Sequence, residues 1–316
     1  MSTKKIITIF GATGAQGGGL AHAILSDAGS EFSVRAVTRD INSAKAKALE
    51  QLGAELVSAD IDNPETMDKA LSGAYGAFFV TFFWAHFSAE KETEEAKHMA
   101  AAARKAGIKH AVWSTLEDVR KFVPLTDESM PTLQGKYKVP HFDGKGEADH
   151  FFVDEGVPVT NMCASFYWDN MIYFGMGPKK NAEGKYTITL PMGEKKMAGI
   201  AAEDIGKCAY GIFKNPKEYI GKTIGIAGDQ LTGNEMAGAL SKALNKEVGY
   251  YAPTPAQYRA FGFPGADDLG NMFQFYHDFE KHCNTSRDVS LSKKLNPELL
   301  SFNAWLNKYA EKIPLD

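Results

Sequence analysis

Three glycines near the N-terminus have the spacing of a loop that holds phosphate groups. Gly11, Gly14 and Gly17 lie in the segment GATGAQG, directly after the apolar run 6–10. In such a loop the first glycine makes a tight turn, the second lets the backbone approach a pyrophosphate, and the third lets the next helix pack closely. The free N–H groups of that helix then bind the phosphates. We therefore predict a dinucleotide site formed by Gly11, Ala12, Thr13, Gly14, Ala15, Gln16 and Gly17.

A basic residue follows the second predicted strand, 32–38. An acidic residue at this place, about 20 residues beyond the glycines, would bind the ribose hydroxyl of NAD, whereas a guanidinium binds the 2′-phosphate of NADP. The sequence has Arg39 here, with Asp40 directly after it and Lys45 on the next predicted helix. The predicted cofactor is therefore NADP(H), with Arg39 on its 2′-phosphate.

Two further strand ends supply candidate contacts to the dinucleotide. We expect Asp60 to accept a hydrogen bond from the adenine amino group and Ile61 to cover the face of the ring. After the fourth strand, Thr81, Phe82 and Phe83 are expected to lie over the dinucleotide, although these aromatic side chains are equally compatible with a place in the core.

The N-terminal half, which must position these residues, alternates predicted strands with predicted helices. Short strands that are almost entirely apolar fit a parallel sheet covered on both faces. We predict an α/β fold with a Rossmann-type doubly wound parallel sheet over residues 1–164. Strands are expected at 6–10, 32–38, 54–59, 77–82, 111–114 and 159–163, and helices at 20–28, 43–52, 64–71, 90–106 and 145–155.

Residues 165–316 are predicted to form a smaller α+β C-terminal domain for a substrate or partner, with some strands returning to the first sheet. The acidic run 90–95 in the first domain is interpreted as a solvated helix face. In the C-terminal half, strands are expected at 186–190 and 222–227, and helices at 202–213, 234–244 and 299–312.

The composition of the chain argues against several classes of function. The 35 Lys and Arg against 39 Asp and Glu give a net charge of −4, so direct nucleic-acid binding is not expected. No apolar run is long enough to cross a membrane and no signal peptide is expected, which favours a cytoplasmic protein. The three cysteines, Cys163, Cys208 and Cys283, show neither a disulfide framework nor a metal-ligand spacing.

Several motifs together resemble one known family. The segments 11–17, 38–39 (TR), 113–115 (WST), 141–147 (HFDGKGE) and 262–266 (GFPGA) are similar to those of the NmrA-like family of atypical short-chain dehydrogenases, and above all to its NADP-sensing members. The resemblance covers essentially the whole chain, and the HFDGKGE segment is far more specific than any glycine spacing.

The resemblance implies NADP in a cleft between a large Rossmann domain and a smaller C-terminal domain. It also implies cofactor contacts near Ser165, Phe166 and Tyr167. The implied role is regulatory: such proteins sense the NADPH/NADP ratio and bind other proteins, in the cytoplasm and, in eukaryotes, also in the nucleus. A second copy of the chain is a further candidate partner.

The catalytic group of active short-chain dehydrogenases is altered here. Those enzymes use a Ser and a Tyr-Lys pair four residues apart, in which the Tyr donates a proton. This chain has Lys145 and Ser114, but His141 stands at the Tyr position, after Pro140, at a loop or helix start. We expect Lys145 to bind the cofactor. His141 and Ser114 are secondary catalytic candidates, with a structural role for His141 as the alternative.

Two functions remain open from the sequence. The first is an NADP(H)-binding redox sensor that binds other proteins and turns nothing over. The second is an NADPH-dependent reductase of quinones, enones or aldehydes, since hydride transfer mainly requires correct placement of the cofactor.

Overall fold

A parallel sheet of seven strands forms the centre of the computed structural model, which describes residues 4–315. Its strand order is β11-β6-β5-β4-β1-β2-β3 and every neighbouring pair is parallel. The order reverses between β1 and β4, where ligands bind in open α/β sheets. The strands are β1 (Lys5–Ile9), β2 (Phe32–Thr38), β3 (Glu55–Ser58), β4 (Gly76–Phe79), β5 (His110–Thr115), β6 (Val159–Cys163) and β11 (Thr223–Gly225).

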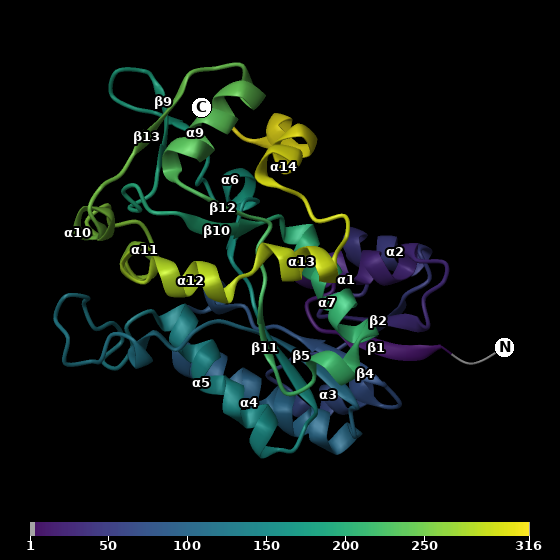
Figure 1. Cartoon of the computed structure of the whole chain (residues 1–316). Helices are drawn as coiled ribbons and strands as arrows, with labels where there is room; N and C mark the ends of the chain where they lie inside the picture. The colour runs from purple at the N-terminus through teal and green to yellow at the C-terminus, as the bar shows by residue number, and fades with distance from the viewer. Residues whose placement is uncertain (1–3, 316) are drawn as a thin grey trace.

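Helices cover both faces of this sheet (Figure 1). One face packs against apolar side chains of α1 (Ala15–Ser26), α2 (Ala44–Gln51) and α7 (Ala202–Lys214). The other packs against α3 (Pro64–Leu71), α4 (Ala89–Ala106) and α5 (Pro140–Asp154). This confirms the predicted doubly wound α/β fold. Short 3₁₀ turns, η1 (Phe83–Ala85) and η2 (Val119–Lys121), follow β4 and β5.

Most of the rest of the chain forms a second lobe beside the carboxyl ends of the strands (Figure 1). It contains two sheets of three strands each, in the orders β12-β10-β7 and β13-β9-β8. Its strands are β7 (Phe166–Tyr167), β8 (Lys179–Lys180), β9 (Tyr186–Thr189), β10 (Met197–Ile200), β12 (Asp229–Leu231) and β13 (Val248–Tyr251). Its helical segments are α6 (Asn170–Tyr173), α9 (Gly233–Leu244), α10 (Pro255–Arg259), α11 (Ala266–Asp278), α12 (Glu280–Ser286), α14 (Phe302–Tyr309) and η3 (Ala310–Lys312). The helices α8 (Pro216–Tyr219) and α13 (Val289–Leu295) instead pack with α7 beside the seven-stranded sheet.

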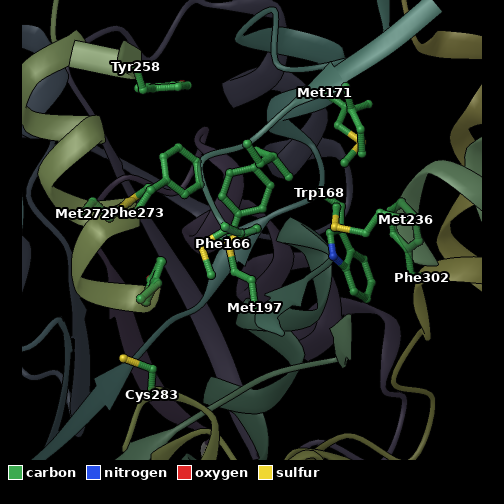
Figure 2. Close-up of a cluster of buried hydrophobic side chains, with 14 of the residues drawn as sticks. Phe166, Trp168, Met171, Met197, Met236, Tyr258, Met272, Phe273, Cys283 and Phe302 are labelled. Atoms are coloured by element: carbon green, nitrogen blue, oxygen red, sulfur yellow. The ribbon is translucent and has the colours of Figure 1, made fainter. Parts of the chain in front are cut away.

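The second lobe has its own core, rich in methionines and aromatic rings (Figure 2). The Trp168 ring lies 5.3 Å from that of Phe302 and 6.2 Å from that of Trp305. A Cβ at Gly199 on β10 would lie 2.2 Å from the indole nitrogen of Trp168. Because no side chain fits there, glycine lets β10 approach the indole directly.

A buried ion pair joins the second lobe to the sheet. Arg287, which follows α12, is completely buried, and its guanidinium binds the two carboxylate oxygens of Glu117 at 2.5 and 2.8 Å. Glu117 lies in the loop after β5. Arg287 Nε also donates to the Ala164 carbonyl at 2.9 Å, directly after β6. Such a two-pronged contact satisfies a buried charge with fixed geometry.

The predicted start of the first helix was wrong for a physical reason. Helix α1 begins at Ala15 rather than residue 20, because the glycines that suggested a longer turn lie inside the helix. A Cβ at Gly19 would lie 2.6 Å from the Glu203 carbonyl oxygen, and one at Gly206 would lie 2.0 Å from the Leu20 nitrogen. Helices α1 and α7 therefore approach each other through glycine, whose weak helix propensity is outweighed by this packing.

Candidate functional site

A cleft of about 2480 Å³ runs along the carboxyl ends of the sheet strands and continues against the second lobe. All the residues predicted from the sequence to contact the dinucleotide line this cleft, and so do His141 and Ser114. The structure therefore brings together side chains from both halves of the sequence. They are Gly11, Ala12, Thr13, Gly14, Ala15, Gln16, Gly17, Arg39, Asp60, Ile61, Thr81, Phe82, Phe83, Lys145, Ser165, Phe166 and Tyr167.

The glycine turn has the backbone geometry of an anion site. Gly11 has a φ of 65°, which a side chain rarely adopts. Gly14 is the N-cap of α1 and has no capping side chain, and the first turn of α1 carries no acidic residue. A Cβ at Gly17 would lie 2.5 Å from the Gly11 carbonyl oxygen. The positive end of α1 therefore opens on the cleft without a protein anion, which fits a pyrophosphate.

Arg39 is exposed at the end of β2. Among residues 4–315, no side chain or carbonyl accepts a hydrogen bond from its guanidinium. The neighbouring Asp40 carboxylate accepts from the backbone N–H of Asn42 at 2.8 Å, within its own turn. Arg39 is thus available to an anion from the cleft, and Lys45 lines the same part of it.

The adenine candidates lie in the turn after β3. The Asp60 carboxylate is exposed and accepts the Asp62 N–H at 3.1 Å, while Ile61 packs partly buried against the core under α3 and α4.

The two aromatic side chains after β4 differ in burial. The Phe83 side chain is buried and Phe82 is more than half exposed at 56%. Only the buried ring thus belongs to a packed cluster.

Lys145 is held by a buried network. Its Nζ donates to Thr81 Oγ1 at 2.6 Å and lies 3.1 Å from Glu92 Oε1. Thr81 Oγ1 in turn donates to the same Glu92 oxygen at 2.6 Å. The ammonium also lies 5.2 Å from the centre of the Trp113 ring. Lys145 therefore enters the cleft with its position fixed and its charge paired by Glu92.

The prediction that the acidic run on α4 is solvated was wrong for two of its carboxyls. Glu92 is completely buried and Glu95 is 8% exposed. They share a face of α4 with Ala96 and Met99, which pack under the sheet. The spacing 92, 95/96, 99 is that of a buried helix face, and it is the signal in the sequence that could have identified them.

Burial has opposite effects on the two titratable side chains beside this network. It raises the pKa of Glu95 to about 7, reinforced by the nearby carboxylates of Asp62 and Glu92. It lowers the pKa of His86, whose Nε2 lies 3.7 Å from Glu95 Oε1. Burial disfavours the charged form of each group.

His141 lies in the first turn of α5, which is the second of the two places, loop or helix start, that the sequence left open. Helix α5 begins five residues before the predicted helix start at Lys145. Its Nδ1 lies 2.5 Å from Oδ1 of Asp268, and Oδ2 of the same carboxylate accepts the His141 backbone N–H at 3.3 Å. Asp268 lies in the first turn of α11 and was not identified from the sequence. It comes just after the GFPGA motif, which was the only local signal.

The candidates after β6 are already bonded within the protein. The Ser165 hydroxyl donates to the Ile226 carbonyl, next to β11. The Tyr167 hydroxyl accepts from Gln16 Nε2 at 2.5 Å, and burial raises its pKa. Phe166 packs into the second-lobe core near Phe273, at 6.1 Å between ring centres. Ser114 is buried on β5. The Gln16–Tyr167 bond thus links the glycine turn directly to the second lobe.

The cleft that contains Lys145 and His141 is also lined by aromatic side chains from four separate segments. These side chains lie after β4, at the end of α6, at the end of β13 and after α10. An exposed apolar surface of this kind marks a binding site when it lies in a concave region. The exposed rings that line the cleft are Phe82, Phe87, Tyr173, Phe174, Tyr251, Phe261 and Phe263.

A family model for the NmrA-like family matches residues 3–306 of the chain. The chain belongs to the NmrA-like family. A Dictyostelium discoideum NmrA-like family protein is 27% identical over 98% of this chain and 99% of its own length. A Penicillium ochrochloron NmrA-like oxidoreductase is also 27% identical, over 96% and 97%. The crystal structure of the negative transcriptional regulator NmrA with NADP has a TM-score of 0.78 at 22% identity, covering 98% of this chain and 96% of that one.

The part of the chain that the structure describes, residues 4–315, contains no candidate for two other kinds of site. No helix there is both long and apolar enough to cross a membrane. In the same part of the chain, no three His, Cys, Asp or Glu side chains gather where they would hold a metal ion.

Proposed function

We propose that this NmrA-like protein binds NADP(H) in the cleft and uses it as a reductase. The free start of α1 would hold the pyrophosphate, Arg39 the 2′-phosphate, and Lys145 the nicotinamide ribose. These positions fit the cofactor because the turn has no room for a side chain at Gly17, and within residues 4–315 no side chain caps the positive end of α1. The bound NADPH would supply a hydride.

The observation that favours reduction is that exposed aromatic side chains line the cleft that also contains Lys145. A sensor needs only a dinucleotide site, whereas the exposed rings of Phe87, Phe174 and Phe263 line the same cleft as His141. Such walls suit a flat, apolar acceptor, and exclusion of water there protects a hydride. Quinones, enones and aromatic aldehydes have this chemistry.

The test combines binding with turnover. Calorimetric titration should give tighter binding of NADPH than of NADH. Stopped-flow absorbance should then show oxidation of NADPH when flat quinones, enones and aromatic aldehydes are added, with slower oxidation for small aliphatic aldehydes. The reductase function fails if NADPH binds and none of these acceptors oxidises it.

The Gln16–Tyr167 hydrogen bond favours a second candidate, the regulatory one. Because it joins the glycine turn to β7 of the second lobe, a dinucleotide on the turn would act on both lobes at once. A sensor that binds other proteins would use this coupling. Hydrogen exchange should then differ between the NADPH- and NADP-loaded protein at residues 165–175. Identical exchange in the two states would remove the structural basis for sensing.

A further inference from the structure

We propose that His141 and Asp268 form a proton-donating pair, in which His141 Nε2 protonates the oxygen of a carbonyl substrate and Asp268 orients the imidazole. The inference rests on the reductase function proposed above. It assigns a positioning role to Asp268, which lies far from His141 in the sequence.

The pair has the geometry that a proton donor needs. A carboxylate oxygen can only accept, so the 2.5 Å contact with Asp268 Oδ1 assigns a hydrogen to His141 Nδ1. The second Asp268 oxygen accepts the His141 backbone N–H at 3.3 Å. The carboxylate therefore fixes both the start of α5 and the rotation of the ring.

Only one of the two partners faces the cleft. His141 lines it, whereas Asp268 is 5% exposed and lies behind the ring, outside the lining. Within residues 4–315, no protein group bonds to His141 Nε2, and this nitrogen is not among the enclosed polar atoms. A histidine with a purely structural role would be expected to have both nitrogens engaged. Here the free nitrogen faces the space where an acceptor would bind.

Neighbouring rings and Lys145 define where that acceptor would lie. The His141 ring is 4.9 Å from the Trp84 ring and 5.8 Å from the Phe83 ring, so it has little freedom to turn. Lys145 is one helical turn further along α5 and lines the same cleft. A carbonyl between His141 and the cofactor would thus present its oxygen to Nε2.

The proposed step balances in atoms and charge. The carbonyl carbon accepts a hydride from NADPH, which is oxidised to NADP⁺, and a C–H bond forms. The π electron pair of the C=O bond moves to oxygen, which takes the proton from Nε2 of the imidazolium form of His141. The imidazole is left neutral, with its Nδ1–H still donated to Asp268, and it regains a proton from water.

A comparison of two kinds of acceptor tests the proton step separately from the hydride step. Reduction of a carbonyl needs a proton, whereas reduction of the N-methylacridinium cation needs only a hydride. For His141→Gln we expect kcat with the fastest carbonyl acceptor of the panel to fall about 100-fold or more. Turnover of acridinium should stay within about threefold, as should the Kd for NADPH.

Asp268→Asn tests the positioning role. Its amide would donate to Nδ1 and so favour the opposite tautomer, and kcat with the carbonyl acceptor should fall roughly 10- to 100-fold. Long-range ¹H–¹⁵N spectra of the unloaded protein report the tautomer directly, with the His141 signals identified from their loss in His141→Gln. We expect Nδ1–H in the wild type and Nε2–H in Asp268→Asn.

Matched controls exclude general damage. His150→Gln changes an exposed histidine on α5, and Asp267→Asn changes the exposed carboxyl next to Asp268. Both should turn over the carbonyl acceptor at the wild-type rate.

The outcomes separate two failures. If the wild type transfers hydride to neither acceptor, the reductase function itself is wrong. If it reduces both and His141→Gln lowers the two rates equally, or neither, the proton-donating role is overturned. A wild-type Nε2–H tautomer, or an Asp268→Asn spectrum equal to the wild type, overturns the role of Asp268.

Discussion

The two basic side chains expected to contact the dinucleotide have opposite surroundings. Arg39 is exposed, and within the described residues nothing accepts a hydrogen bond from its guanidinium. Lys145 is buried, bonded to Thr81 and paired with Glu92. The difference separates two tasks: an exposed guanidinium gains most of its contacts when an anion arrives, whereas a paired ammonium is placed before any ligand binds.

The largest expected effect tests the pairing of Lys145. Glu92→Gln keeps the shape of the side chain but leaves a buried ammonium without its counter-charge. We expect the free energy of unfolding to fall by about 3 kcal/mol or more, the range found when one partner of a buried pair is removed. Urea unfolding of the unliganded protein measures it, with the exposed Glu94→Gln as the control. Equal stability of the two variants would mean that Lys145 is not paired as described.

The second-largest effect is expected at the glycine turn. In Gly17→Ala the new Cβ would lie 2.5 Å from the Gly11 carbonyl oxygen, whereas in Gly18→Ala it would lie 3.4 Å from the Ala12 oxygen, an ordinary contact. Since the turn must shift, affinity for both NADPH and NADH should fall about 100-fold, or about 2.7 kcal/mol, in Gly17→Ala alone. Calorimetric titration of both variants with NADPH and with NADH measures this loss of affinity. Normal binding by Gly17→Ala would remove the turn from the site.

Arg39→Ala tests whether the exposed guanidinium distinguishes NADPH from NADH. Loss of a charged hydrogen bond should weaken NADPH binding by roughly 1.5–3 kcal/mol and leave NADH binding nearly unchanged. The effect should shrink at high salt because Arg39 is exposed. Lys47→Ala, an exposed change on α2, is the matched control. Equal losses for both cofactors would place Arg39 away from the 2′-phosphate.

The smallest effect concerns the second buried carboxyl of α4. The pKa of Glu95 is raised from its usual 4.5 to about 7 by burial, so the folded protein binds this proton more tightly than the unfolded chain. Ionisation of Glu95 therefore lowers the free energy of unfolding as the pH rises from about 4.5 to about 7. Glu95→Gln should gain about 1–2 kcal/mol at pH 8 and almost nothing at pH 4.5. Thermal unfolding at both pH values checks this, and an equal gain at both would contradict the buried-acid interpretation.

Local patterns were sufficient to predict the sheet and the glycine turn. The predicted bounds of β2, α3 and β6 match the structure residue for residue, because apolar runs bounded by turn residues are decided by nearby sequence. The short strands β8, β10 and β12 were not predicted. They are two to four residues long, and such strands are stabilised by the surfaces they pack against rather than by their own pattern.

For the same reason, the sequence did not predict which polar side chains from distant segments pair with each other. His141 and Lys145 were identified from the resemblance to the Tyr-Lys pair of short-chain dehydrogenases. Asp268 and Glu92 were not identified, since each meets its partner only through helix packing. The pairing of Glu117 with Arg287 is likewise invisible in the sequence. A single sequence gives the identity of a polar side chain, and the fold decides which opposite charge it meets.

The Arg287 contact limits how a bound dinucleotide could move the molecule. The guanidinium binds Glu117 after β5 and the Ala164 carbonyl after β6. It therefore holds together the two places where the chain passes from the sheet to the second lobe. A hinge there would have to strip a buried charge from its counter-ion before it could open. The Arg287–Glu117 pair therefore opposes hinge motion between the sheet and the second lobe at this place.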